Sequence, residues 1–228
     1  MTKKDYSNFT KEQLLSLIEK LEDKKKYGLV WDEERVPEKV VDECINNLPV
    51  LSEIKNKEIS TDGNDPTHII IEGDNFHALS VLNYTHSGKI DVIYIDPPFN
   101  TGAKDWKYNN SYVDINDTWR HSKWIQFMYN RLKISKDLLA DDGVLICAID
   151  HNEQENLGIL LRELFGNYDI TCVTIIHNPS GIQGDNFSHN NEYAYFVYPK
   201  KKNIIAPEIR DDENADVRGF MNGAKGNT

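Results

Sequence analysis

The residues best suited to chemistry are four consecutive ones, Asp96, Pro97, Pro98 and Phe99. They directly follow an apolar run at 92–95 that is typical of a buried strand. Two prolines end a strand and stiffen the backbone, because each fixes φ and lacks an N–H donor. On one interpretation, Asp96 only satisfies local backbone donors where the strand ends. On the other, a carboxylate, a rigid carbonyl and an aromatic ring are presented together to a substrate.

This set of groups suits alkylation of the exocyclic amine of a nucleobase. The lone pair of such an amine is delocalised into the ring, so the nitrogen is a weak nucleophile. Two acceptors directed at its N–H bonds, the Asp96 carboxylate and the Pro97 carbonyl, favour a tetrahedral nitrogen and stabilise the developing positive charge. Phe99 offers a flat face for a base taken out of the duplex. Stacking on one aromatic ring returns ~1–3 kcal/mol, which offsets much of the cost of extruding the base.

The tetrapeptide is similar to the catalytic motif of amino-methyltransferases that act on adenine N6 or cytosine N4. Further ordered blocks resemble the modification (Mod) subunit of type III restriction–modification systems. These blocks are residues 71–75, 91–102, 124–128, 131–132, 142–150, 165–166, 178–181 and 192–193. The resemblance runs from residue 68 to the C-terminus, and the segment 27–31 also fits. One departure is His151, where the family tends to have an acidic residue.

The resemblance implies a site-specific enzyme that transfers a methyl group from S-adenosyl-L-methionine to adenine N6 in duplex DNA. In such an enzyme Asp96, Pro97, Pro98 and Phe99 are catalytic. The resemblance also implies a homodimer that works with a restriction subunit of the helicase and nuclease type. Methylation of cytosine N4 stays open, because that amine has the same chemistry as the adenine amine.

Two further polar residues are candidates for contacts with the cofactor. Asp74 lies between a predicted strand and a predicted helix, where it either contacts the cofactor or caps the helix. Asn100 extends the catalytic loop and either contacts cofactor or substrate or shapes the turn.

The remaining reactive and aromatic side chains favour plainer roles. The three cysteines never form a C-x-x-C pair, which argues against a disulfide framework and against a structural zinc site. No metal site is predicted. Trp106, Tyr108 and Tyr112 form either a lid over the base or a cluster buried beneath the loop, and burial is the plainer interpretation.

The elements that must position the tetrapeptide alternate between strand and helix from residue 68 onward. Strands are predicted at 68–72, 90–95, 144–149, 171–176 and 193–198, and helices after Asp74, at 118–139 and at 152–164. This alternation predicts an α/β protein with a mostly parallel sheet covered on both faces, and the family implies an incomplete Rossmann-like class I methyltransferase fold. Ligands bind such sheets at the carboxyl ends of strands, where Asp74, Asp96 and Asp150 fall. The catalytic methyltransferase region is assigned to residues 66–205.

Residues 1–65 are predicted to form a helical N-terminal extension and linker. The spacing of Thr10 and Gln13 predicts a capping box at the start of a helix over 10–26. A second helix is predicted over 37–47. The apolar stripe of the first helix docks either on its own domain or on a second subunit, and docking on its own domain is the preferred interpretation.

The net charge of −11 conflicts with a grip on duplex DNA, which requires a basic face. Residues 206–228 are expected to be the truncated start of a target-recognition region, and no F-x-G-x-G cofactor motif occurs in the chain. The chain therefore resembles an N-terminal fragment, which accounts for the acidic charge. An inactive subunit that only binds partners or DNA is the alternative. The chain has neither an apolar run of ~20 residues nor a secretion signal, so a cytoplasmic location without membrane contact is expected.

Overall fold

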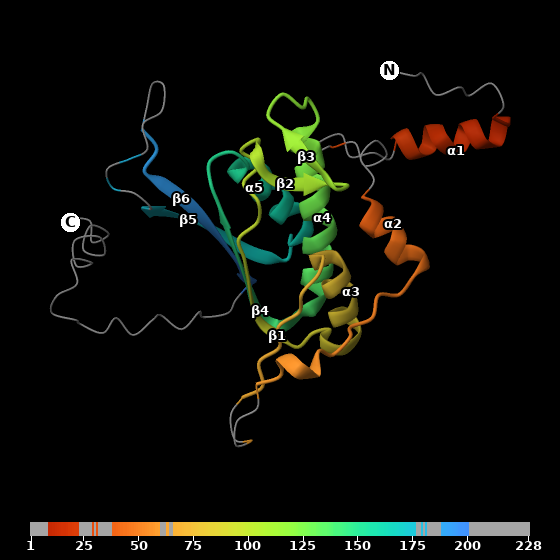
Figure 1. The fold of residues 1–228 in the computed structure, drawn as a ribbon. Helices are drawn as coiled ribbons and strands as arrows, with labels where there is room; N and C mark the ends of the chain where they lie inside the picture. Colours follow the sequence, from red (N-terminus) through yellow and green to blue (C-terminus); the bar gives the residue numbers. More distant parts are fainter. Residues whose placement is uncertain are drawn as a thin grey trace.

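The computed structural model describes residues 9–22, 29, 31, 38–59, 63, 66–176, 179, 181 and 188–200. The helices are α1 (Lys11–Glu22), α2 (Lys39–Asn46), α3 (Asn75–His86), α4 (Arg120–Leu138) and α5 (Gln154–Leu164), with a 3-10 turn at Lys55–Lys57. The strands are β1 (Ile90–Ile95), β2 (Ala103–Tyr108), β3 (Ser111–Asp114), β4 (Leu139–Ile149), β5 (Tyr168–Ile176) and β6 (Asn191–Pro199). Figure 1 shows the helices α3, α4 and α5 beside the larger sheet.

The larger sheet has the strand order β1-β4-β6-β5, and β2 pairs with β3 in a separate hairpin. β1 and β4 are parallel and are connected through α4, which is the βαβ unit of a Rossmann-like fold. The pairs β4–β6 and β5–β6 are antiparallel, so the prediction of a mostly parallel sheet is wrong for the described strands. β6 follows β5 in the chain but lies between β4 and β5 in the sheet, and it runs antiparallel to both.

The predicted strand at 68–72 does not form. Ile69 and Ile70 are 67% and 96% exposed, and this segment has no assigned secondary structure. β-branched residues favour strands only where a neighbouring strand supplies backbone hydrogen bonds and a packing surface. No described strand pairs with this segment, so its strand propensity is not realised.

One face of the sheet carries the core. Leu145, Cys147 and Ile149 of β4 are fully buried and share a cluster with side chains of α4 and α5. On the opposite face Val92 of β1 and Val173 of β5 remain 59% and 42% exposed. The described helices therefore cover one face only, and the prediction of two covered faces is wrong for this part of the chain.

α4 ends one residue before its predicted end, and β4 begins at once. The predicted stop at 141–143 lies inside β4, where the register with β1 shifts between the pairs Ile90–Leu139 and Val92–Val144. Between these pairs one residue of β1 lies opposite four of β4. The stop signal therefore appears as an irregularity within the strand rather than as a turn before it.

The N-terminal extension is helical, as predicted. The Thr10 backbone N–H donates to Gln13 Oε1 at 2.9 Å, and the Gln13 N–H donates to Thr10 Oγ1 at 3.2 Å, so the capping box is confirmed. Its apolar stripe does not dock on the domain, because Leu15 and Ile18 are 49% and 48% exposed. α1 lies apart from the sheet and its helices (Figure 1), so the preferred interpretation was wrong.

Other parts of the extension do contact the domain. Trp31 Nε1 donates to Gln126 Oε1 on α4 at 2.5 Å. Glu38 is 5% exposed and pairs with Arg131 of α4, with Arg131 Nη1 at 2.9 Å from Glu38 Oε2. Polar groups directed at α4 therefore help to hold the extension, together with Leu29 and Trp31, which pack against the core cluster. In the described part of the chain no helix is both long and apolar enough to cross a membrane.

Candidate active site

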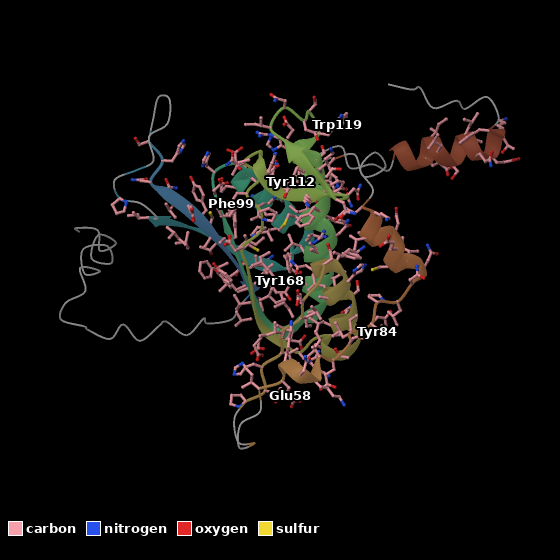
Figure 2. All side chains as sticks on the ribbon, viewed as in Figure 1. Glu58, Tyr84, Phe99, Tyr112, Trp119 and Tyr168 are labelled. Atoms are coloured by element: carbon pink, nitrogen blue, oxygen red, sulfur yellow. The ribbon has the colours of Figure 1, made fainter. Side chains whose placement is uncertain are left out.

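The tetrapeptide forms a loop at the carboxyl end of β1, which ends at Ile95. Asp96 is exposed, whereas Pro97, Pro98 and Phe99 are half-buried. The ring of Phe99 contacts the core cluster. In Figure 2, Phe99 lies at the same end of the molecule as Tyr112, and Tyr84 and Glu58 lie at the other end. The loop thus combines an exposed carboxylate with an aromatic ring that is partly accessible.

Trp124 of α4 holds the middle of the loop. Its side chain is fully buried, and its indole Nε1 donates to the Pro98 carbonyl at 2.6 Å. Since Pro98 has no N–H and a fixed φ, this hydrogen bond to its carbonyl restricts its remaining freedom.

Asn100 holds the loop on the other side of Phe99. It has φ 60, a left-handed conformation that Asn tolerates better than most residues, and its side chain is fully buried. Its Oδ1 accepts from Trp106 Nε1 at 3.0 Å. Its Nδ2 donates to Glu153 Oε1 and to the Arg120 carbonyl at 3.4 Å. The side-chain amide is therefore hydrogen-bonded within the protein. A contact between Asn100 and the cofactor remains a proposal, and it would involve the Asn100 backbone.

Glu153 is a residue of this site that sequence reasoning missed. Its side chain is fully buried at the N-terminal end of α5, close after the carboxyl end of β4. Besides Asn100, its carboxyl group accepts from His121 Nδ1 at 2.7 Å and from Asn156 Nδ2 at 2.6 Å. The available signal was a glutamate just after a strand and immediately before an apolar helix. That position is ordinarily read as a solvated helix start.

Asp74 caps α3. Its Oδ1 accepts from the Phe76 N–H at 2.7 Å, and the same oxygen lies 3.4 Å from Arg131 Nη2. The capping alternative is therefore confirmed. Because the segment before it is not a strand, Asp74 does not lie at the end of one. Its side chain is 45% exposed, so a second role in cofactor contact remains a proposal.

Asp150 follows β4 directly, as predicted, and is 9% exposed. Its two carboxylate oxygens accept from the Asn152 backbone N–H at 2.8 Å and from Asn152 Nδ2 at 2.6 Å. It therefore shapes the turn between β4 and α5. His151, the departure from the family pattern, has a side chain 49% exposed and stacks on His189 with ring centroids 4.3 Å apart.

The aromatic cluster lies on the β2–β3 hairpin, which was not predicted. Trp106 and Tyr108 are 6% and 5% exposed, so burial beneath the loop is confirmed for both. Trp106 also lies against Phe127 of α4, with ring centroids 5.1 Å apart. Tyr112 is 52% exposed and is not part of that core.

Burial keeps two groups near the core neutral. Desolvation raises the pKa of Tyr108 well above its ordinary value, and the nearby Glu38 raises it further while Arg131 opposes the change. Desolvation likewise raises the pKa of the Cys147 thiol. Neither group is a candidate acid or base near neutral pH.

Comparison with known proteins assigns the family. Residues 90–225 match the N6_N4_Mtase family model, described as DNA methylase. The match covers more than half of the chain, so the chain belongs to this family of DNA methylases. The resemblance to type III Mod subunits is confirmed. The predicted Rossmann-like α/β class is confirmed by the elements and by the parallel pair of β1 and β4.

Particular relatives are the Mod subunits of type III restriction–modification enzymes. The chain is 30% identical over 240 residues to the EcoPI Mod subunit of Escherichia phage P1, covering 92% of this chain and 36% of that protein. It is 29% identical to the EcoP15I Mod subunit of Escherichia coli, over 93% of this chain and 36% of that protein. Over 125 residues it is 42% identical to a probable HindVI Mod subunit of Haemophilus influenzae, covering 54% of this chain and 16% of that protein. The chain thus spans about a third of the length of the first two relatives.

Proposed function

We propose that this chain carries the catalytic loop of a site-specific DNA methyltransferase that modifies adenine N6 in duplex DNA. The observation that carries the proposal is the loop itself. It has an exposed carboxylate at Asp96 and a half-buried ring at Phe99, and it is held by Trp124 and Asn100. The names of the relatives support the wider role in a restriction–modification system.

Each residue of the loop has a distinct role in this mechanism. The Asp96 carboxylate accepts one N–H of the adenine amine, and the Pro97 carbonyl accepts the other, because the Pro98 carbonyl is already bonded to Trp124. These acceptors stabilise the positive charge that forms on the nitrogen during methylation. Phe99 stacks on the extruded base, and Pro98 keeps the carbonyls in place. Rigid acceptors need no reorganisation when the charge develops.

S-adenosyl-L-methionine supplies an electrophilic methyl group in this proposal. Asp74 fits a contact to the cofactor, because its partly exposed carboxylate can accept from an ammonium or hydroxyl group. Asn100 fits such a contact through its backbone only, since its side-chain amide is engaged with Trp106 and Glu153.

We also propose a homodimer that works with a restriction subunit in the cytoplasm, where duplex DNA is the substrate. The exposed apolar residues Leu14, Leu15 and Ile18 of α1 support a contact with a second subunit, because an apolar helix stripe is stable when it is covered. Sedimentation of the chain with α1 and without it tests this proposal. A monomer in both cases would contradict it.

The experiment for the function is nucleoside analysis of treated DNA. Protein from the complete reading frame is incubated with labelled S-adenosyl-L-methionine and with DNA free of other methylation. The DNA is then digested, and its nucleosides are separated by mass spectrometry. N6-methyladenine is expected, and N4-methylcytosine would replace the adenine assignment by the cytosine alternative. Absence of methyl transfer, together with no heat of cofactor binding in calorimetry, would favour the inactive subunit.

A further inference from the structure

Glu153 makes contacts that a helix-capping residue does not need. A polar side chain at the start of a helix ordinarily bonds the free N–H groups of the first turn. Glu153 occupies that position in α5 but makes no side-chain cap hydrogen bond. Its carboxyl group is instead directed at Asn100 on the catalytic loop and at His121 on α4.

General stability does not account for this arrangement. Burying a carboxyl group costs free energy unless its oxygens are well bonded, and an apolar side chain of similar volume avoids that cost. Glu153 is 0% exposed, and its two oxygens accept from Asn100, His121 and Asn156. These contacts join the loop after Phe99, the start of α4 and the start of α5 at one point.

The hydrogen bonds of His121 have a definite direction. Arg120 Nε lies 3.1 Å from His121 Nε2 and can only donate, so Nε2 is the acceptor. The proton of the neutral imidazole is then on Nδ1, which donates to Glu153. Asn100 Nδ2 also donates to Glu153. The side chain at position 153 must therefore accept hydrogen bonds from both Asn100 and His121, and a carboxylate can do so.

We infer that Glu153 is a positioning residue for methyl transfer and that it acts through Asn100. This inference rests on the proposed function. Asn100 is adjacent to Phe99 and has a left-handed backbone at φ 60. The amide bonds to Glu153 and Trp106 hold that conformation. Phe99, half-buried against the core cluster, is thereby held in the loop that carries the exposed Asp96, while Glu153 itself touches no reacting atom.

The test uses Glu153→Gln, with Glu155→Gln as the matched control. A glutamine of the same shape places an N–H donor against the donors of Asn100, His121 or Asn156, so at least one contact is lost. Glu155 is exposed two residues further along the same helix. In the complete protein, Glu153→Gln is expected to lower kcat about 10- to 100-fold, the scale for a displaced reacting group. The rates of the control are expected to stay unchanged.

A second arm measures the loop without relying on activity. Hydrogen exchange in the 228-residue chain is expected to become about tenfold faster at 99–102 in Glu153→Gln, the factor for one lost hydrogen bond. Exchange in β6 is expected to stay unchanged. If hydrogen exchange accelerates equally in the loop and in β6, the inference is overturned, because Glu153 then stabilises the whole domain rather than the loop.

Asn100→Gly separates action through Asn100 from an independent effect. Glycine tolerates the left-handed backbone but has no amide, so this variant is expected to reproduce the faster loop exchange. In the double variant Asn100→Gly/Glu153→Gln, loop exchange is expected to be little faster than in Asn100→Gly alone. If the effects of the two substitutions on loop exchange add in full, the inference is overturned. If Glu153→Gln does not fold, Asn100→Gly alone tests whether the Asn100 amide holds the loop. Unchanged loop exchange in Asn100→Gly would overturn the inference.

The two proposals fail in different ways. If the complete wild-type protein transfers no methyl group, the proposed function is wrong, and loop exchange still decides the role of Glu153. If the wild type is active while Glu153→Gln keeps both its kcat and its loop exchange, only the positioning role is wrong.

Discussion

Trp124 Nε1 donates to the Pro98 carbonyl at 2.6 Å, which fastens the loop of residues 96–99 to a helix that follows it in the chain by more than twenty residues. The bond joins the rigid part of the loop to a fully buried indole. Asp96 lies outside this anchored part and remains exposed. Its substitution is therefore expected to change methyl transfer without changing the fold.

Asp96→Asn is expected to lower methyl transfer about 10²- to 10³-fold, the usual effect of removing one preorganised group that stabilises transition-state charge. The amide keeps the shape but loses the negative charge. Single-turnover transfer of labelled methyl groups to DNA measures the effect. Asp91→Asn, an exposed aspartate of β1, is the control and should retain wild-type rates. A near-normal rate in Asp96→Asn would contradict the proposed mechanism.

Phe99→Ala is expected to weaken DNA binding in the extruded state, because stacking of one base on an aromatic ring contributes ~1–3 kcal/mol. Phe99→Tyr keeps the ring and should behave like wild type. Fluorescence of 2-aminopurine placed at the target base reports extrusion directly. If both variants extrude the base equally well, Phe99 does not stack on it.

Glu38→Gln is expected to lower the free energy of unfolding by about 2 kcal/mol, because it removes the nearer of the two carboxylates that pair with the buried Arg131 and leaves Asp74 at 3.4 Å. The matched control is Glu43→Gln, which removes a partner from an exposed pair with Lys39 of 3.4 Å and should cost less than ~0.5 kcal/mol. Urea unfolding of both variants measures the difference. Equal costs would show that the buried pair does not hold the extension to α4.

Stability is expected to fall as pH rises above about 9, where thiols of the unfolded chain begin to ionise. Burial raises the pKa of Cys147 above its ordinary 9.0, so the unfolded state loses this proton at a lower pH than the native state does. The contribution of the Cys147 thiol to the free energy of unfolding is fully present below the pKa that the thiol has in the unfolded chain, and it is lost as the pH rises above that pKa. One such thiol accounts for about 1.4 kcal/mol between roughly pH 8 and roughly pH 10.

Tyr195, whose pKa burial raises to about 12, adds to the same alkaline loss. Urea unfolding across this pH range measures it. Cys147→Ala should flatten the dependence on pH even though it lowers stability at every pH. Cys172→Ala, at an exposed cysteine beside Tyr195, should change the slope less than Cys147→Ala does. A slope that Cys147→Ala does not alter would contradict the assignment.

Local signals in the sequence predicted most of the helices and strands and the loop that follows β1. The capping box of Thr10 and Gln13, the strand before Asp96 and the two prolines after it depend on residues adjacent in the chain, so pattern reasoning finds them. The aspartate cap of α3 was foreseen for the same reason. The proposed reactive groups are also adjacent in the chain, because the chemistry was inferred from a carboxylate, two prolines and a ring in sequence.

Tertiary structure alone decided which of these groups are exposed and what holds them. The apolar run at 68–72 shows strand propensity, but pairing depends on a neighbour elsewhere, and none of the described strands provides it. Glu153 and Asn100 are 53 residues apart, and their contact arises only when β4 brings the start of α5 beneath the loop. Hydrogen bonds between distant side chains leave no periodic trace in a sequence, because their geometry depends on the packing of whole elements.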